Sequence, residues 1–187
     1  DNFSLTLSDL SPNVTYYVQA YAENPAGISY GDQQSFTTKT ALPSVGMATL
    51  VTSTSSSLTV SASLIDDGGE APSEVGFYYG TSADFDLSSA IKVSANLSQS
   101  CFTANLAGLV RATQYYICPF AENSVGEMVG DVLQCRTLAE IPVIETASVT
   151  GVSILDAVCG GFIVDNGGEE IISKGLVWST EPNPMVN

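Results

Sequence analysis

The amino-acid sequence predicts an all-β chain, built from β-sandwich modules that follow one another. Three observations lead there. Apolar and polar residues alternate with period two, glycine-bearing turns separate the alternating runs, and the chain repeats itself at an offset of 99 residues, as from Leu7 to Leu106. No segment keeps the period of 3.6 residues that an amphipathic helix needs. Short strands at this spacing within about 100 residues are typical of a seven-stranded β-sandwich.

The repeat sets the domain organisation. Residues 3–38 align without a gap to residues 102–137. Each linker ends in a proline, Pro43 or Pro142, a residue that is tolerated as the first residue of a strand. We therefore predict that residues 1–40 are the C-terminal half of a module. Residues 41–139 are then a complete module, and residues 140–187 are the N-terminal half of a third. The two halves together lack 11 residues (198 − 187) of a full module.

The strands are predicted from rows of inward-facing residues, taken in chain order. Each row of the complete module has a counterpart 99 residues away in one of the halves. The rows are Phe3/Leu5/Leu7, Tyr16/Val18/Ala20/Ala22, Leu58/Val60/Ala62/Leu64, Phe102/Ala104/Leu106 and Tyr115/Ile117/Pro119/Ala121. Between the rows, Asp66–Glu70 and Asp165–Glu170 combine carboxylates with paired glycines. These two loops favour a tight turn with Asp caps. A weak calcium site is the alternative, although EF-hand spacing is absent.

A family resemblance becomes visible at the turn before the second row. Leu10-x-Pro12-x-x-x-Tyr16, followed by Ala22-x-Asn24-x-x-Gly27, resembles the fibronectin type III module at its E–F corner and F strand. Leu109, Tyr115, Ala121, Asn123 and Gly126 repeat the pattern, with Arg111 in place of the proline. The resemblance implies an immunoglobulin-like sandwich in which Tyr16 and Tyr115 are tyrosine corners that bond to upstream backbone. The sequence pattern also resembles that of tandem type III-like modules in bacterial secreted and cell-surface proteins.

Composition excludes several classes of function. Twenty Asp and Glu against five Lys and Arg give a net charge of −15, which repels nucleic acid and anionic lipid. The chain has no histidine, the commonest general base and a frequent zinc ligand. We find no nucleophile–base pair and no phosphate-binding loop. The sequence therefore predicts no enzyme, no cofactor, no metal site and no membrane insertion.

The four cysteines are predicted to be free thiols. Strand parity turns Cys135 and Cys159 inward in different modules, and it turns Cys101 and Cys118 outward on opposite sheets. A disulfide needs Cα atoms within about 7 Å, and no pair meets that condition. One alternative stays open, because a one-residue register slip would let Cys118 pair with Cys135.

Aromatic residues give one candidate partner-binding face. Tyr78, Tyr116 and Phe120 are expected on the outer face of the C–F–G sheet, beside the apolar loop residues Met128 and Val129. An exposed aromatic strip could stack on sugar rings or contact a protein, and ordinary cross-strand packing is the simpler interpretation. Leu10, Leu109, Tyr16, Tyr115 and Trp178 are predicted to be structural residues, with Trp178 in a core.

The function predicted first is a non-enzymatic spacer, scaffold or adhesion segment of a secreted or cell-surface protein. The alternative is a carbohydrate- or protein-binding accessory module of a secreted glycan-degrading enzyme. Because a half sandwich leaves its core face in water, we also expect residues 140–187 of one chain to complete residues 1–40 of the next, head to tail. A milder version is that a longer tandem chain was cut at the same loop in two modules. The predicted partners are thus a second copy, another surface protein or a glycan.

Overall fold

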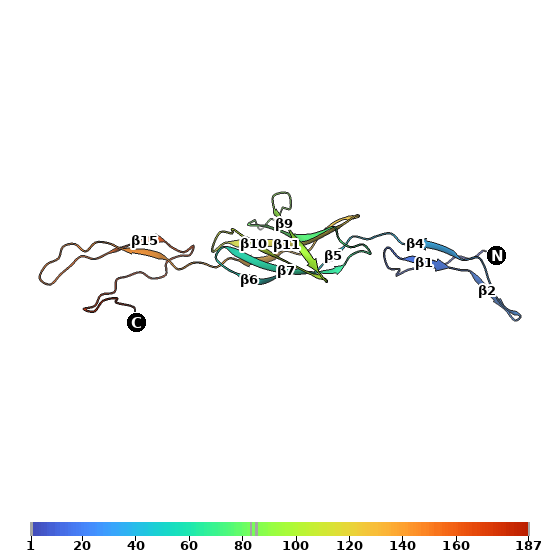
Figure 1. Ribbon diagram of the computed structural model, residues 1–187, viewed down its shortest axis with the longest axis horizontal. Coiled ribbons are helices and arrows are strands. Elements are labelled where there is room, and N and C mark those ends of the chain that lie inside the picture. Colours follow the sequence, from blue (N-terminus) through green and yellow to red (C-terminus); the bar gives the residue numbers. More distant parts are fainter. Residues whose placement is uncertain (1, 83, 85, 187) are drawn as a thin grey trace.

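A computed structural model of the chain describes residues 2–82, 84 and 86–186. Figure 1 shows three parts in a line: a central β-sandwich, an N-terminal segment on one side and a C-terminal segment on the other. We use these names for residues 41–139, 2–40 and 140–186 respectively. The described residues contain strands and no helix, so the predicted all-β class is confirmed.

The central sandwich contains nine of the described strands, which correspond to seven strands of which the first and last are interrupted. β5 and β6 both pair with β7, and β12 and β13 both pair with β11. β9 pairs first with β8 and then with β10, so it links the two layers. The bounds are β5 (Ser44–Val45), β6 (Thr49–Ser53), β7 (Ser57–Asp66), β8 (Glu74–Gly80), β9 (Ile91–Ser98), β10 (Cys101–Ala107), β11 (Gln114–Asn123), β12 (Gly126–Val129) and β13 (Leu133–Arg136).

The core lies between the layers and contains most of the predicted inward residues of β7, β10 and β11, together with residues of β8 that no predicted row included. Period-two alternation places every second side chain of β7, β10 and β11 inside. The Phe77 and Phe102 rings meet across the core with centroids 5.2 Å apart. The core residues are Ala48, Leu58, Val60, Ala62, Val75, Phe77, Tyr79, Phe102, Ala104, Leu106, Leu109, Tyr115, Ile117, Ala121 and Cys135.

Both corner tyrosines receive a hydrogen bond from upstream backbone. The Tyr115 phenol oxygen accepts from the Val110 N–H at 2.9 Å, and Tyr16 accepts from the Ser11 N–H at 2.8 Å. Each bond spans five residues and fixes the turn that precedes β11 or β1. Leu109 is buried beside Tyr115, whereas Leu10 is only half-buried.

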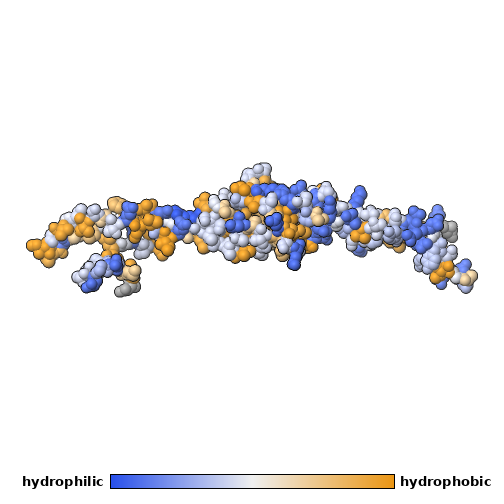
Figure 2. Space-filling view, in the orientation of Figure 1, coloured by the Kyte–Doolittle hydropathy of each residue, from blue (hydrophilic) through white to orange (hydrophobic). Residues whose placement is uncertain are grey.

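The terminal segments form only two-stranded sheets. In the N-terminal segment β1 (Thr15–Val18) pairs with β4 (Gln34–Thr37), and β2 (Tyr21–Asn24) pairs with β3 (Gly27–Tyr30). In the C-terminal segment β14 (Val143–Thr146) pairs with β15 (Gly161–Asp165). Their apolar rows face outward, and Figure 2 shows apolar side chains gathered along the surface of the C-terminal segment.

The prediction that Trp178 lies in a core is wrong. Its counterpart Tyr79 is buried, with its ring centroid 6.3 Å from that of Tyr115. Trp178 is 90% exposed, because no described strand covers it as β11 covers Tyr79. Cys159, also predicted to face inward, is exposed for the same reason.

Candidate functional site

The outer face of β8, β9, β11 and β12 carries a cluster of one lysine, one tyrosine and three glutamates. We call Glu74, Tyr78, Lys92, Glu122 and Glu127 the lateral cluster. Strand register brings them together, because Tyr78 lies opposite Lys92, and Glu122 lies opposite both Glu74 and Glu127. Residues that are opposite or diagonal on one face of a sheet are within reach of long side chains.

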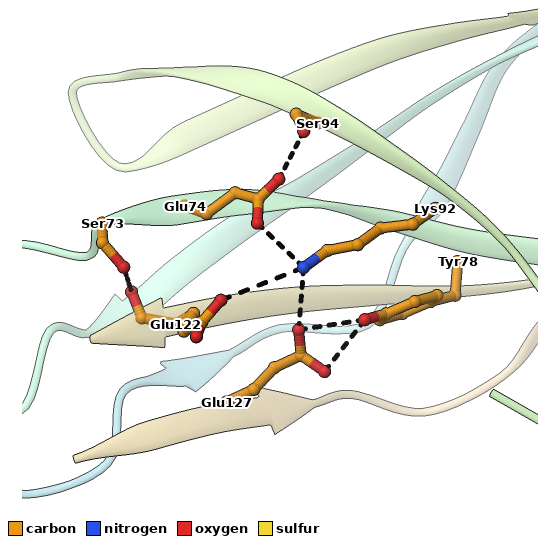
Figure 3. Close-up of polar contacts among 7 residues, drawn as sticks. All are labelled: Ser73, Glu74, Tyr78, Lys92, Ser94, Glu122 and Glu127. Carbon is orange, nitrogen blue, oxygen red and sulfur yellow. Dashed lines mark hydrogen bonds and ion pairs between the residues drawn. The ribbon is translucent and has the colours of Figure 1, made fainter. Parts of the chain in front are cut away.

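Lys92 is the centre of the lateral cluster, as Figure 3 shows. Its Nζ lies 2.8 Å from Glu74 Oε2, 3.2 Å from Glu127 Oε2 and 3.9 Å from Glu122 Oε2. The Tyr78 hydroxyl donates to both oxygens of Glu127, at 3.1 and 3.0 Å. The Ser94 hydroxyl donates to Glu74. Three carboxylates around one ammonium leave the cluster with an excess of negative charge.

These contacts shift the pKa values of Lys92, Glu74 and Tyr78. Desolvation lowers the pKa of Lys92, but hydrogen bonds and charge from Glu74 and Glu127 outweigh it and raise the pKa well above its usual range. The hydrogen bond from Lys92, and then that from Ser94, lower the pKa of Glu74. Desolvation, followed by the bond to Glu127, raises the pKa of Tyr78. A lysine held as a cation is neither a nucleophile nor a base, so the arrangement favours a structural or binding role.

Phe120 belongs to the same face but is fully buried, so its predicted place on an exposed strip is wrong. Lys92 Nζ lies 4.3 Å from the centroid of its ring, and the Tyr78 ring packs at 5.0 Å with a tilt of 46°. The ring lies against Gly76, where a Cβ would be 2.8 Å from Phe120 Cε1. The tilted, covered rings do not form the coplanar platform that sugar stacking requires.

The other residues of the predicted face are only partly brought together. Val129 lies opposite Phe120 and is half-buried. Met128 lies opposite the core residue Ala121, so it points to the other side of the sheet. Tyr116 lies farther along β11, opposite Gly80. Reasoning from aromatic residues missed Lys92, although its period-two position on a strand was a usable signal.

All four cysteines are free, and the register excludes the slip that would pair Cys118 with Cys135. Cys135 lies opposite Tyr115, whereas Cys118 lies opposite Tyr78 on the outer face. Cys118 faces outward, as predicted, but it is buried under neighbouring side chains of that face. Burial raises the pKa of both thiols, and the charge of Asp131 adds to the rise at Cys118.

The two acidic loops are glycine turns capped by their own side chains. Asp66 and Asp67 accept from the N–H groups of Gly68 and Gly69 at 2.7 and 2.8 Å. Asp165 and Asn166 do the same for Gly167 and Gly168 at 2.9 and 3.0 Å. The four glycines have φ between +74° and +91°, the region that glycine adopts most easily. In the described part of the chain, no group of three or more His, Cys, Asp or Glu side chains is placed to hold a metal ion.

The same turns make the contacts between the segments, at two junctions that repeat with the sequence. Within the central sandwich, the Ala41 N–H donates to the Gly68 carbonyl at 2.9 Å and holds the glycine turn beside the linker. Across the first junction, a Cβ on Gly69 would lie 2.6 Å from the Pro12 carbonyl oxygen. Asn13 Nδ2 also donates to the Gly69 carbonyl at 2.7 Å. Only a residue without a side chain fits at position 69.

The second junction lies 99 residues later and has an equivalent glycine turn. Within the C-terminal segment, the Glu140 N–H donates to the Gly167 carbonyl at 2.8 Å. A Cβ on Gly168 would lie 3.0 Å from Ala112 Cβ and 3.1 Å from Arg111 Cγ. At both junctions, therefore, the corner turn of one segment packs on the glycine turn of the next.

Comparisons with known proteins support the fold. No protein-family model matches the chain, and no curated protein matches it. Solved structures do resemble it, among them domains of CD45 and of CNTN1. Domains d3–d4 of the extracellular region of rat CD45 have a TM-score of 0.50 and 19% identity, over 72% of this chain and 68% of that one. The FN1–FN3 domains of chicken CNTN1 have a TM-score of 0.42 and 20% identity, over 72% of this chain and 46% of that one.

The described strands and the likeness to the CD45 domains show the fold of fibronectin type III and immunoglobulin-like β-sandwiches. This chain spans less than half of the CNTN1 chain that it matches. The described residues contain no helix long and apolar enough to cross a membrane.

Proposed function

We propose that the chain is a non-enzymatic, extracellular spacer or scaffold segment, built from type III-like modules in a semi-rigid row. Residues 1–40, 41–139 and 140–187 are then the three modular units. One observation carries the proposal: the close packing of Gly69 on Pro12 and Asn13 recurs, with an offset of 99 residues, as the packing of Gly168 on Arg111 and Ala112. A repeated, sterically specific contact fixes the orientation of neighbouring modules, which a flexible linker does not do. The partners proposed for the segment are other proteins of a cell surface.

The test compares two glycine variants by small-angle X-ray scattering. Gly69→Ala places a Cβ against the Pro12 carbonyl and forces a non-glycine residue to a φ of +84°. Gly108→Ala is the matched control, because its φ is +72° but no atom lies within 4 Å. We expect Gly69→Ala alone to change the scattering from that of a stiff rod to that of a flexible chain. A wild-type profile already typical of a flexible chain would contradict the proposal.

The lateral cluster weakens the alternative of a glycan-binding accessory module. That function requires aromatic rings open to solvent, but Phe120 lies under Lys92 and Tyr78. An apolar sugar face would first have to displace the ion pairs of Lys92. We therefore favour the scaffold.

Head-to-tail assembly is a second candidate, and the exposed apolar rows favour it. One groove in the N-terminal segment is lined by Phe3, Leu5 and Phe36, and one in the C-terminal segment by Ile144, Phe162 and Leu176. By the offset of 99, Phe3 and Leu176 hold the places of Phe102 and Phe77, which pack together in the central sandwich. Residues 140–187 of one copy would thus complete residues 1–40 of another.

Light scattering over a range of concentrations tests this assembly. A mass that rises in multiples of 19.5 kDa supports it, and Leu176→Asp is then expected to return the chain to a monomer. A constant monomer mass overturns head-to-tail assembly and leaves the spacer proposal unchanged.

A further inference from the structure

We propose that Arg111 and Arg136 form an electrostatic latch at the second junction, which recognises a following module that carries carboxylates on its linker and glycine turn. The inference rests on the proposed row of modules. It adds that ion pairs of the two arginines select the following module and fix its orientation. The first junction has the same packing of a corner turn on a glycine turn but lacks the two arginines, so the two junctions differ in their response to salt.

Arg111 bridges the linker and the glycine turn of the following segment. Its Nη1 lies 2.9 Å from Glu140 Oε2, and its Nη2 contacts Asp165. Glu140 is also held from the other side, where the Ser55 hydroxyl donates to its Oε1 at 2.7 Å. The guanidinium therefore joins two parts of one segment to the corner turn of another, with the fixed fork geometry that arginine provides.

Arg136 adds a second contact from the end of β13. Its Nη2 lies 2.7 Å from Glu169 Oε1, while Nε and Nη2 also donate to the Ala112 carbonyl at 3.1 and 2.9 Å. The Ala112 contact orients the guanidinium toward the next segment. Two of the five cations in this acidic chain thus lie at one junction.

The first junction has the acceptors without the two arginines, and Lys39 in its linker is exposed and makes no ion pair among the described residues. Pro12 and Thr37 hold the places of Arg111 and Arg136, and Ala41 holds that of Glu140. Asp66 and Glu70 keep their carboxylates, but Asp66 caps Gly68 and Glu70 accepts from Ser124, both within the central sandwich. A neutral side-chain bond from Asn13 joins the segments instead.

Partly exposed ion pairs are weak singly, but three of them that hold one surface can restrict its orientation. Salt at 1 M reduces the screening length to about 3 Å, which is short compared with the size of the latch. High salt should therefore loosen the second junction and leave the first unchanged.

The native cysteines allow the test on the full chain. Cys101 in the central sandwich and Cys159 in the C-terminal segment are exposed, whereas Cys118 and Cys135 are buried. Spin labels on the two exposed thiols report the distance across the second junction by pulsed electron resonance. For the first junction, Ser35→Cys with Cys159→Ser moves one label to the exposed strand β4.

A narrow distance distribution at low salt that broadens at 1 M salt supports the latch, provided the first-junction pair does not broaden. Arg136→Glu should lose the narrow peak, and adding Glu169→Arg should restore it, which separates the ion pair from damage to the fold. A narrow peak insensitive to salt and to Arg136→Glu overturns the latch alone. A broad distribution at low salt overturns the latch and the proposed row together.

Discussion

The central sandwich and the terminal segments carry the same alternation of apolar residues with opposite burial. Phe102 is 1% exposed and its counterpart Phe3 is 77% exposed, while Leu106 and Leu7 are 1% and 46% exposed. Phe102 and Leu106 lie in β10, whereas the predicted strand with the row Phe3/Leu5/Leu7 is wrong, because residues 3–7 have no strand to pair with and form none. Only the second sheet, present over the central residues, takes the apolar side chains out of water.

The largest expected effect tests this difference in burial directly, through the free energy of unfolding. Phe102→Ala should reduce the free energy of unfolding by about 3–5 kcal/mol, because it leaves a cavity beside Phe77. Phe3→Ala should change it by less than about 0.5 kcal/mol, as for an exposed site. Denaturant unfolding followed by circular dichroism measures both. If both variants lost the same free energy of unfolding, Phe3 would be buried in solution and the difference in burial between the two phenylalanines would be contradicted.

A glycine pair gives the next effect. A Cβ on Gly76 would lie 2.1 Å from the Val93 carbonyl oxygen, whereas one on Gly175, 99 residues later, meets no atom within 4 Å. Gly76→Ala should cost about 1–3 kcal/mol through overpacking, and Gly175→Ala should cost nothing measurable. Thermal unfolding of the two variants makes the comparison. A tolerated Gly76→Ala would mean that β8 and β9 are farther apart than described.

The two corner tyrosines test the same difference in burial, with a smaller expected loss of stability. Tyr115→Phe removes the acceptor for the Val110 N–H and should cost about 1 kcal/mol. Tyr16→Phe removes the equivalent bond to Ser11 at an exposed site, where water can replace it, so a smaller loss is expected. Urea midpoints of the two variants test the order. Tyr16→Phe as the more harmful change would reverse the interpretation.

The smallest effect concerns pH. The pKa of Glu74 is lowered in the folded state, so its contribution is present above the unfolded value of about 4.3 and is lost as pH falls through the folded pKa. The raised pKa values of Tyr78 and Lys92 act oppositely, because their contribution is lost as pH rises above about 10.

Glu74→Gln should therefore flatten the acid side of the stability profile, by less than about 1 kcal/mol because the group is largely exposed. Unfolding midpoints between pH 2 and pH 6 measure it, with Glu23→Gln in the N-terminal segment as the control. An unchanged acid side would mean that the bond from Lys92 to Glu74 does not persist in solution.

Much of the fold could be predicted from the sequence because its signals are local. Alternation predicted the buried rows of β7, β10 and β11, and the resemblance at Leu109 and Tyr115 placed the corner before β11. The paired glycines predicted both capped turns. Turn chemistry and period two act within a few residues, so the sequence contains them in full.

The candidate site could not be predicted in the same way. Parity placed Cys118 and Phe120 on the outer face, but their burial depends on Tyr78 and Lys92, which come from other strands. Lys92 and its glutamates are separated by up to 35 residues, and Arg111 and Asp165 by 54. The amino-acid composition gives the number of charged residues but does not show which of them form ion pairs.

Neighbours along the chain specify the strands of the central sandwich with their inward faces, the corners, the turns and the repeat of 99 residues. The tertiary structure decided which inward faces are buried, which aromatic rings are covered, and which junction is joined by charge. The division has a physical cause. Backbone geometry depends on neighbours along the chain, whereas burial and ion pairing depend on neighbours in space that only the assembled sheets bring together.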